Sequence, residues 1–136
     1  MNLHASLSVD ARHDKVWVTF RVENRGERRV WLPRGLAADT RPAGRLFDVR
    51  LHPGGVAIAF VGRAAPGAAG AASDWLELPP HSAHTHTVDI TSDYAFRSGD
   101  HTYELRYAGL ALADIHQLDA TTPLVTDTVM FRHIAP

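Results

Sequence analysis

The stretch Val16-Trp17-Val18-Thr19-Phe20-Arg21-Val22-Glu23-Asn24 decides the fold class of this chain. Every second residue from Val16 to Val22 is apolar, and the residues between them are mostly polar. This period of two predicts a strand with one face in a core and the other toward water. Asn and Gly in the next four residues, 24–27, favour a turn. Residues 29–32 are then expected to return as a partner strand, which would make a hairpin.

The alternation seen in residues 16–24 recurs along most of the chain. Further strands are expected over residues 3–9, 46–51, 56–61, 75–78, 83–90, 102–107 and 125–131. Residues 64–73 are rich in Ala and Gly and predict a loop, whereas the apolar but irregular residues 110–118 favour a loop with one helical turn. The pattern predicts an all-β chain: an antiparallel, immunoglobulin-like β-sandwich of eight or nine strands, in a single domain spanning residues 1–136.

The aromatic residues divide into core and surface candidates. Tyr103 follows Gly99 at the start of a strand, which suits a latch like a tyrosine corner. The residues that fall on apolar faces, and are expected in the core, are Phe20, Phe47, Tyr103, Tyr107 and Phe131.

Composition excludes some classes of partner. With 136 residues, 45% of them hydrophobic, the chain can bury a substantial core, and its net charge of −1 gives no global attraction to nucleic acid or an anionic membrane. The first half is basic and the second acidic, which indicates either cross-strand pairing or a basic face that meets an acidic partner. The residues of that alternative face are Arg21, Arg25, Arg28, Arg29 and Arg34.

The chain contains no cysteine, so disulfides and thiol chemistry are excluded. No apolar run reaches the length of a membrane span, and we expect no membrane partner. If Met1 is the native start, we expect a cytoplasmic protein. If a signal peptide was removed, a secreted or periplasmic location follows instead.

Several short segments occur in an order found in a known family. They are Phe60-Val61-Gly62-Arg63-Ala64-Ala65-Pro66, Leu76-Glu77-Leu78-Pro79, Val88-Asp89-Ile90, Tyr94 and Gly99 with Tyr103. Together with Val16–Asn24 and Leu46–Val49, they resemble the N-terminal β-sandwich domain of deuterolysin-type (peptidyl-Lys and peptidyl-Asp) zinc metallopeptidases. The resemblance covers residues 14–133 and implies an immunoglobulin-like module that accompanies a protease.

The chemistry of that family is missing from this chain. Those peptidases carry His-Glu-x-x-His on a separate catalytic domain, where the histidines hold zinc and the glutamate activates water. This sequence contains no His-Glu dipeptide. None of the family's catalytic residues can be carried over, and we expect no enzymatic activity.

Histidines form the one candidate metal site in the sequence. On a strand, His84 and His86 point to the same face, and an i, i+2 pair can chelate zinc, copper or nickel. His81 in the preceding turn is a possible third ligand, and His101 lies before another strand. The alternative is that these histidines are polar residues at the rim of the sandwich.

Binding residues are expected on loops and exposed aromatics. Residues 63–75 combine Arg63, Pro66 and Trp75, and loops held by a rigid scaffold often carry recognition. Trp17 falls on the polar face of its strand, and Trp31 lies near Pro33. Exposed tryptophans are enriched at interfaces, although they also cover sheet edges.

The leading expectation for function is a non-catalytic protein-binding module. It would be an inhibitor, an immunity-like protein or an accessory protein, with a metallopeptidase as a possible partner. The alternatives are a metal-binding protein using His81, His84 and His86, and a structural homodimer paired through sheet edges.

Overall fold

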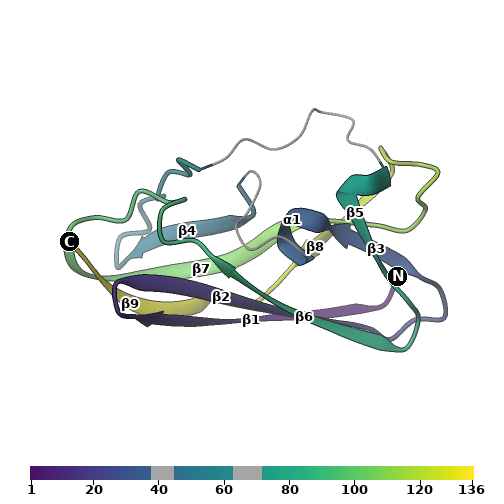
Figure 1. The fold of residues 1–136 in the computed structure, drawn as a ribbon, viewed down its shortest axis with the longest axis horizontal. Coiled ribbons are helices and arrows are strands. Elements are labelled where there is room, and N and C mark those ends of the chain that lie inside the picture. The colour runs from purple at the N-terminus through teal and green to yellow at the C-terminus, as the bar shows by residue number, and fades with distance from the viewer. Residues whose placement is uncertain (38–44, 63–71) are drawn as a thin grey trace.

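The structure, a computed structural model, describes residues 1–37, 45–62 and 72–136. These residues form two antiparallel sheets packed face to face, so the predicted all-β sandwich is confirmed, with nine strands in the described residues (Figure 1). The first sheet contains β1 (Leu3–Arg12), β2 (Lys15–Asn24) and β6 (Ser82–Asp89). The second sheet contains β3 (Val30–Pro33), β4 (Phe47–His52), β5 (Trp75–Leu78), β7 (Gly99–Leu112), β8 (Thr121–Val125) and β9 (Val129–Ala135).

The first sheet has the order β1-β2-β6. β1 and β2 form a hairpin whose register runs from Leu3 opposite Asn24 to Arg12 opposite Lys15. The two residues of the turn, His13 and Asp14, have positive φ angles of 54° and 63°. This is the conformation of a type I′ turn, whose twist matches that of the strands it joins.

The second sheet is organised around the long strand β7. Its first half lies between β4 and β9, and its second half pairs with β8 and, at Leu112, with β3. β5 pairs with the other side of β3. Two short helices, α1 (Arg34–Ala37) and η1 (Ala72–Asp74), lie next to β3 and β5 in the sequence.

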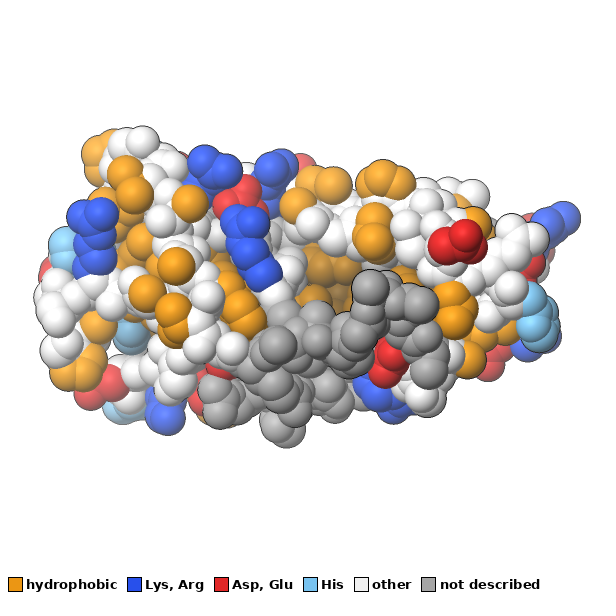
Figure 2. Space-filling view, turned by 90° about the horizontal axis from the view of Figure 1, so that it is seen from above, with side chains coloured by type: hydrophobic (Ala, Val, Ile, Leu, Met, Phe, Trp, Pro, Cys, Tyr) orange, Lys and Arg blue, Asp and Glu red, His pale blue; other side chains and the backbone are white. Residues whose placement is uncertain are grey.

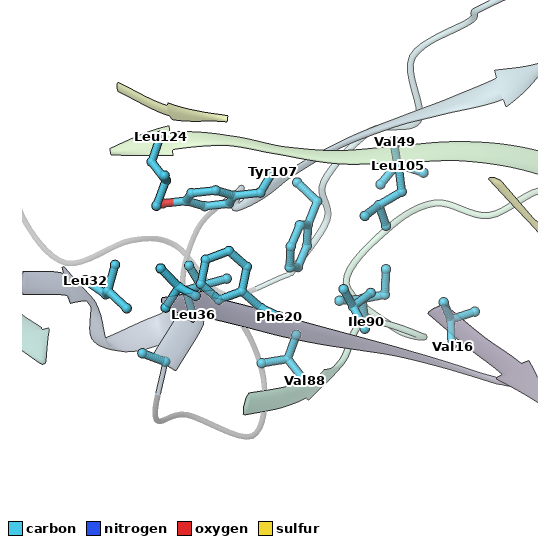
Figure 3. Packing of buried hydrophobic residues seen from close by; sticks show 14 of the residues in the cluster. Val16, Phe20, Leu32, Leu36, Val49, Val88, Ile90, Leu105, Tyr107 and Leu124 are labelled. Carbon is cyan, nitrogen blue, oxygen red and sulfur yellow. The ribbon is translucent and has the colours of Figure 1, made fainter. Parts of the chain in front are cut away.

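The core lies between the two sheets and contains the predicted strand face of β2. Val16, Val18, Phe20 and Val22 are all 0% exposed. The ring of Phe20 meets that of Tyr107 from β7 edge-on, with centroids 5.4 Å apart, and Leu36 from α1 packs beside them (Figure 3). The five aromatic residues expected in the core are buried, which confirms that prediction.

Tyrosine hydroxyls tie loops to strands around this core. The Tyr103 hydroxyl accepts a hydrogen bond of 3.1 Å from the Arg97 amide, so the predicted latch is present. Tyr94 makes a second latch, because its hydroxyl donates to the Phe47 carbonyl at 3.0 Å and accepts from the Phe47 amide at 2.9 Å. Burial raises the pKa of Tyr94 to about 12, so the hydroxyl stays protonated and able to donate.

The predicted hairpin between residues 16–24 and 29–32 is wrong. β3 pairs with β5 and β7 in the second sheet, and β1 takes the place beside β2. The cause is the side chain of Asn24, which is 1% exposed and donates to the carbonyls of Leu78 and Pro79. These bonds direct the chain after β2 across to the second sheet.

Three other predicted segments differ from the structure. Residues 56–61 form two isolated bridges rather than a strand, because the segment leaves β4 to bond to residues 93 and 95. Residues 110–112 complete β7, and 113–120 form turns without a helical turn. Residues 125–131 are not one strand: β8 ends at Val125, and the Thr126 hydroxyl accepts the Tyr107 amide at 2.9 Å before β9 begins.

Candidate functional site

Two of the three predicted surface tryptophans lie on one face of the second sheet. Trp31 on β3 is opposite Glu77 on β5, and Pro33 is opposite Trp75. Directly paired residues share a sheet face, as do residues two apart on one strand, so these four side chains point outward together. We call them the Trp31 face. Trp17 lies elsewhere, on the outer face of the first sheet, where it is 40% exposed.

A hollow of about 640 Å³ adjoins Trp31. Its walls come from the turn between β2 and β3, the turn after β5, and the loop between β7 and β8. The lining residues are Glu27, Arg28, Arg29, Trp31, Pro80, Ala113, Asp114, Ile115 and His116. Three connecting segments of a rigid sandwich therefore meet at one place, as in many binding sites built on β scaffolds.

Asn24 fixes the first wall of the hollow. Its side-chain nitrogen donates to the Arg28 carbonyl at 2.8 Å, and its side-chain oxygen accepts the Gly26 amide at 3.0 Å. The same nitrogen contacts the carbonyls of Leu78 and Pro79 at 3.2 Å. One buried amide thus holds the β2–β3 turn against the start of the β5–β6 connection.

Asp114 organises the opposite wall. Its carboxylate accepts the His116 amide at 2.9 Å, and its carbonyl accepts the Gln117 amide at 3.0 Å. A side chain that bonds its own backbone two residues on stabilises a tight turn. This turn places Ile115 and His116 beside Trp31, because Trp31 pairs with Leu112 at the end of β7.

The charges at the hollow are partly neutralised. Arg29 forms a 3.0 Å ion pair with Glu77, and His81 lies 3.0 Å from Glu27. Within the part of the chain that the structure describes, the Arg28 side chain has no ion-pair partner. The hollow therefore offers one cation next to an apolar wall formed by Trp31 and Ile115.

The five arginines of the predicted basic face do not act as one patch. Arg21 and Arg25 both pair with Glu23, and Arg34 donates to the Ser73 carbonyl at 2.8 Å. Figure 2 shows hydrophobic side chains lying among both basic and acidic ones over the face it presents. Arg21 and Arg25 thus share one carboxylate of the first half, and among the described contacts of these five arginines only the Arg29–Glu77 pair reaches an acidic residue of the second half.

The three candidate metal ligands are not brought together. His84 and His86 do share a face, with stacked rings 6.3 Å apart, but the His84 Nε2 lies 2.6 Å from the Ala37 carbonyl. His81 turns away toward Glu27, and His101 lies 2.9 Å from the Ser98 carbonyl on the other sheet. Among the described residues, no group of three or more His, Cys, Asp or Glu side chains is placed to hold a metal ion.

A second polar cluster centres on Asp48 of β4. Its carboxylate accepts from Arg50 at 3.1 Å and from Arg106 at 3.3 Å, and pairs with Arg45. Burial opposes ionisation, but these arginines hold the pKa of Asp48 below its usual range. A carboxylate held in this way is a permanently charged structural anchor and is poorly suited to exchange protons.

The loop predicted to carry recognition lies mostly outside the described residues, including Arg63 and Pro66. Gly62, the last described residue before this loop, belongs to the motif Phe60–Pro66, and packing explains why it is glycine. A Cβ on Gly62 would clash with the carboxylate of the buried Asp93, so only glycine fits there. Trp75, at the other end, is half-buried on β5.

The sequence named Trp31 and Trp75 as binding candidates but did not place Arg28, Ile115 and His116 beside Trp31. Trp31 on β3 pairs with Leu112 at the end of β7, next to the β7–β8 loop, and no local pattern indicates that contact.

Comparisons with known proteins give no match: no family model and no curated protein corresponds to this chain. None of the helices in the described ranges is long and apolar enough to cross a membrane.

Proposed function

We propose that this chain is a non-catalytic protein-binding module that recognises its partner through the Trp31 face and the adjoining hollow. The observation that carries the proposal is the placement of Trp31 beside Arg28, between three connecting segments. Tryptophan and arginine are the residues most often responsible for binding energy at protein interfaces. An inhibitor, an immunity-like protein or an accessory protein would each use such a surface.

The chemistry of the hollow favours one kind of contact on the partner. Arg28 can pair with a carboxylate, and the wall formed by Trp31, Pro80 and Ile115 can cover an apolar side chain. The partner surface would therefore present an acidic group beside an apolar one. The resemblance to the accessory domain of zinc peptidases makes a metallopeptidase the first partner class to test.

The test is affinity capture from an extract of the source cells, followed by titration with each purified candidate. We expect wild-type protein to retain a partner that the double variant Trp31→Ala/Arg28→Glu loses. Trp17→Ala is the matched control, because it removes an exposed tryptophan from the other sheet. The double variant should lower affinity at least tenfold, and the control should leave it unchanged.

A panel of metallopeptidases, assayed with and without the chain, separates inhibition from mere binding. If Trp17→Ala weakens capture as much as the double variant, the Trp31 face is not the interface. Should no partner be retained and no peptidase be inhibited, the proposal fails as a whole.

A further inference from the structure

Three edge strands of this sandwich, β4, β5 and β8, carry features that protect them against pairing with another chain. The edge of β4 is covered by the following residues, since the Leu51 amide donates to the Val56 carbonyl and the Ile58 amide to the Val49 carbonyl. β8 contains Pro123, which cannot donate a ladder bond, and β5 has only four residues. Short edges, proline and covering segments are the usual devices that prevent edge-to-edge association.

Among the described residues, β1 has none of these devices. It is an edge strand of ten residues without proline or lysine, and the one described strand that pairs with it is β2 (Figure 1). β9 lies near it in the other sheet but hydrogen bonds to β7. The inward-facing residues of β1 are only partly buried, whereas the corresponding residues of β2 are fully buried. These partly covered residues are Leu3, Ala5, Leu7, Val9 and Ala11.

The register of the hairpin shows which backbone groups of β1 face outward. Arg12 and Lys15 flank a two-residue turn and therefore form a hydrogen-bonded pair. Two bonds agree with this alternation: the Arg25 amide donates to Asn2, and the Ile90 amide donates to Val16 on the opposite side of β2. The even-numbered residues of β1 thus bond to β2. The odd-numbered residues direct their amides and carbonyls away from β2.

The sequence of β1 is complementary to itself in one antiparallel register. With Leu7 of two copies opposite each other, the apolar residues form one continuous inner stripe. On the outer face, His4 lies opposite Asp10 of the second copy, twice, and Ser6 lies opposite Ser8. Moving the centre to Ser8 would place His4 opposite Arg12 and lose this charge complementarity. Opposite charges favour a directly paired register and like charges disfavour it.

We propose that two copies of this chain associate through β1, antiparallel and centred on Leu7, to form a continuous six-stranded sheet. The symmetry axis passes through the Leu7 pair, so the interface is isologous and closed. The pairing supplies partners for the outward backbone groups and covers the half-buried apolar stripe. It leaves the Trp31 face on the other sheet accessible, and it does not depend on what that face binds.

Site-directed cross-linking tests both the interface and its register, because the chain has no cysteine of its own. Ser6→Cys and Ser8→Cys are prepared separately, mixed, oxidised and run on a non-reducing gel. The proposed register predicts a disulfide-linked dimer in the mixture and little in either variant alone. Thr85→Cys mixed with Thr87→Cys is the matched control, with the same spacing on β6 at the other edge of the sheet.

Each outcome of the cross-linking either supports or overturns the proposal. Strong linkage of Ser8→Cys by itself would show a register centred on Ser8, and equal linkage of the β6 control would show random collision. Either result overturns the proposed interface.

Sedimentation equilibrium of the wild-type chain, over micromolar to millimolar concentrations, supplies the independent measurement. We expect a monomer–dimer equilibrium that Ala5→Pro abolishes, because the Ala5 amide faces the second copy rather than β2. His4→Asp, at an exposed site, provides a variant that leaves folding intact and should weaken the dimer, because the introduced carboxylate would lie opposite Asp10 of the second copy. A wild-type chain that is monomeric throughout this range would rule the dimer out.

Discussion

β1 and β2 are neighbouring strands of ten residues each, with the same alternation of apolar and polar side chains. Yet the inward residues of β2 are completely buried, and those of β1 are only partly so. The difference arises from position, because among the described strands β2 has a neighbour on each side and β1 has a neighbour on one side. Alternation therefore determines which face of a strand turns inward, and the neighbouring strands determine how deeply that face is buried.

The largest loss of stability should come from creating a cavity in the core next to the centre of β2. Phe20→Ala removes a fully buried ring packed against Tyr107, and we expect a loss of about 3–5 kcal/mol in the free energy of unfolding. Leu7→Ala on β1 should cost about 1–2 kcal/mol, because part of that side chain already contacts water. Urea unfolding followed by circular dichroism measures both. Equal losses would mean that β1 is buried as deeply as β2.

A smaller effect is expected where β2 ends. Asn24→Ala leaves several buried or partly buried backbone groups without their partner, and we expect the free energy of unfolding to fall by about 1–3 kcal/mol. The matched change Ser8→Ala on the exposed face of β1 should have almost no effect. If the two variants unfold at the same urea concentration, the Asn24 side chain does not anchor the turn.

The smallest effect concerns the buried histidine of β9, the strand that lies near β1. Burial lowers the pKa of His133 below its ordinary value of 6.5, and the charge of Asp14 only partly opposes this. The unfolded chain then binds the proton more readily, so stability is fully present above about pH 6.5 and falls as the pH drops toward the folded value.

The free energy of unfolding should accordingly decrease between neutral and mildly acidic pH, by less than about 1.4 kcal/mol per pH unit. His133→Phe should flatten this dependence, because the ring already packs against Phe96. Thr85→Ala, at an exposed position of β6, removes no titratable group and is the control that should leave the slope unchanged. A slope that persists in His133→Phe would assign the titration to another group.

The strands with strict alternation could be predicted from sequence, as β2, β6 and the first half of β7 show. Which strands pair with each other could not be predicted, because strand pairing depends on hydrogen bonds between segments distant in the sequence. Asn24 looked like the start of a hairpin turn, but its amide bonds to Leu78 at the end of β5 and to Pro79 after it. The positive-φ pair His13 and Asp14 was the local signal for the real hairpin, since a two-residue turn requires residues that tolerate this conformation.

The candidate site, like the fold, could be predicted from the sequence only in part. Single tryptophans outside the core could be named from the sequence, and the half-buried Trp31 and Trp75 lie on one face. The two tryptophans share that face because of the register in which β3 pairs with β5. Arg28 lies near Trp31 because Asn24 holds the β2–β3 turn in place. Both are tertiary features without a local pattern.

The anchoring by Asn24 has a consequence for protein engineering. Within the β2–β3 turn, its side chain hydrogen bonds to main-chain atoms, the Arg28 carbonyl and the Gly26 amide. The side chains at positions 27, 28 and 29 are exposed and carry no part of that anchor. These three positions can therefore be randomised in a display library while the scaffold keeps its shape, which turns this end of the sandwich into a site where new specificities can be selected.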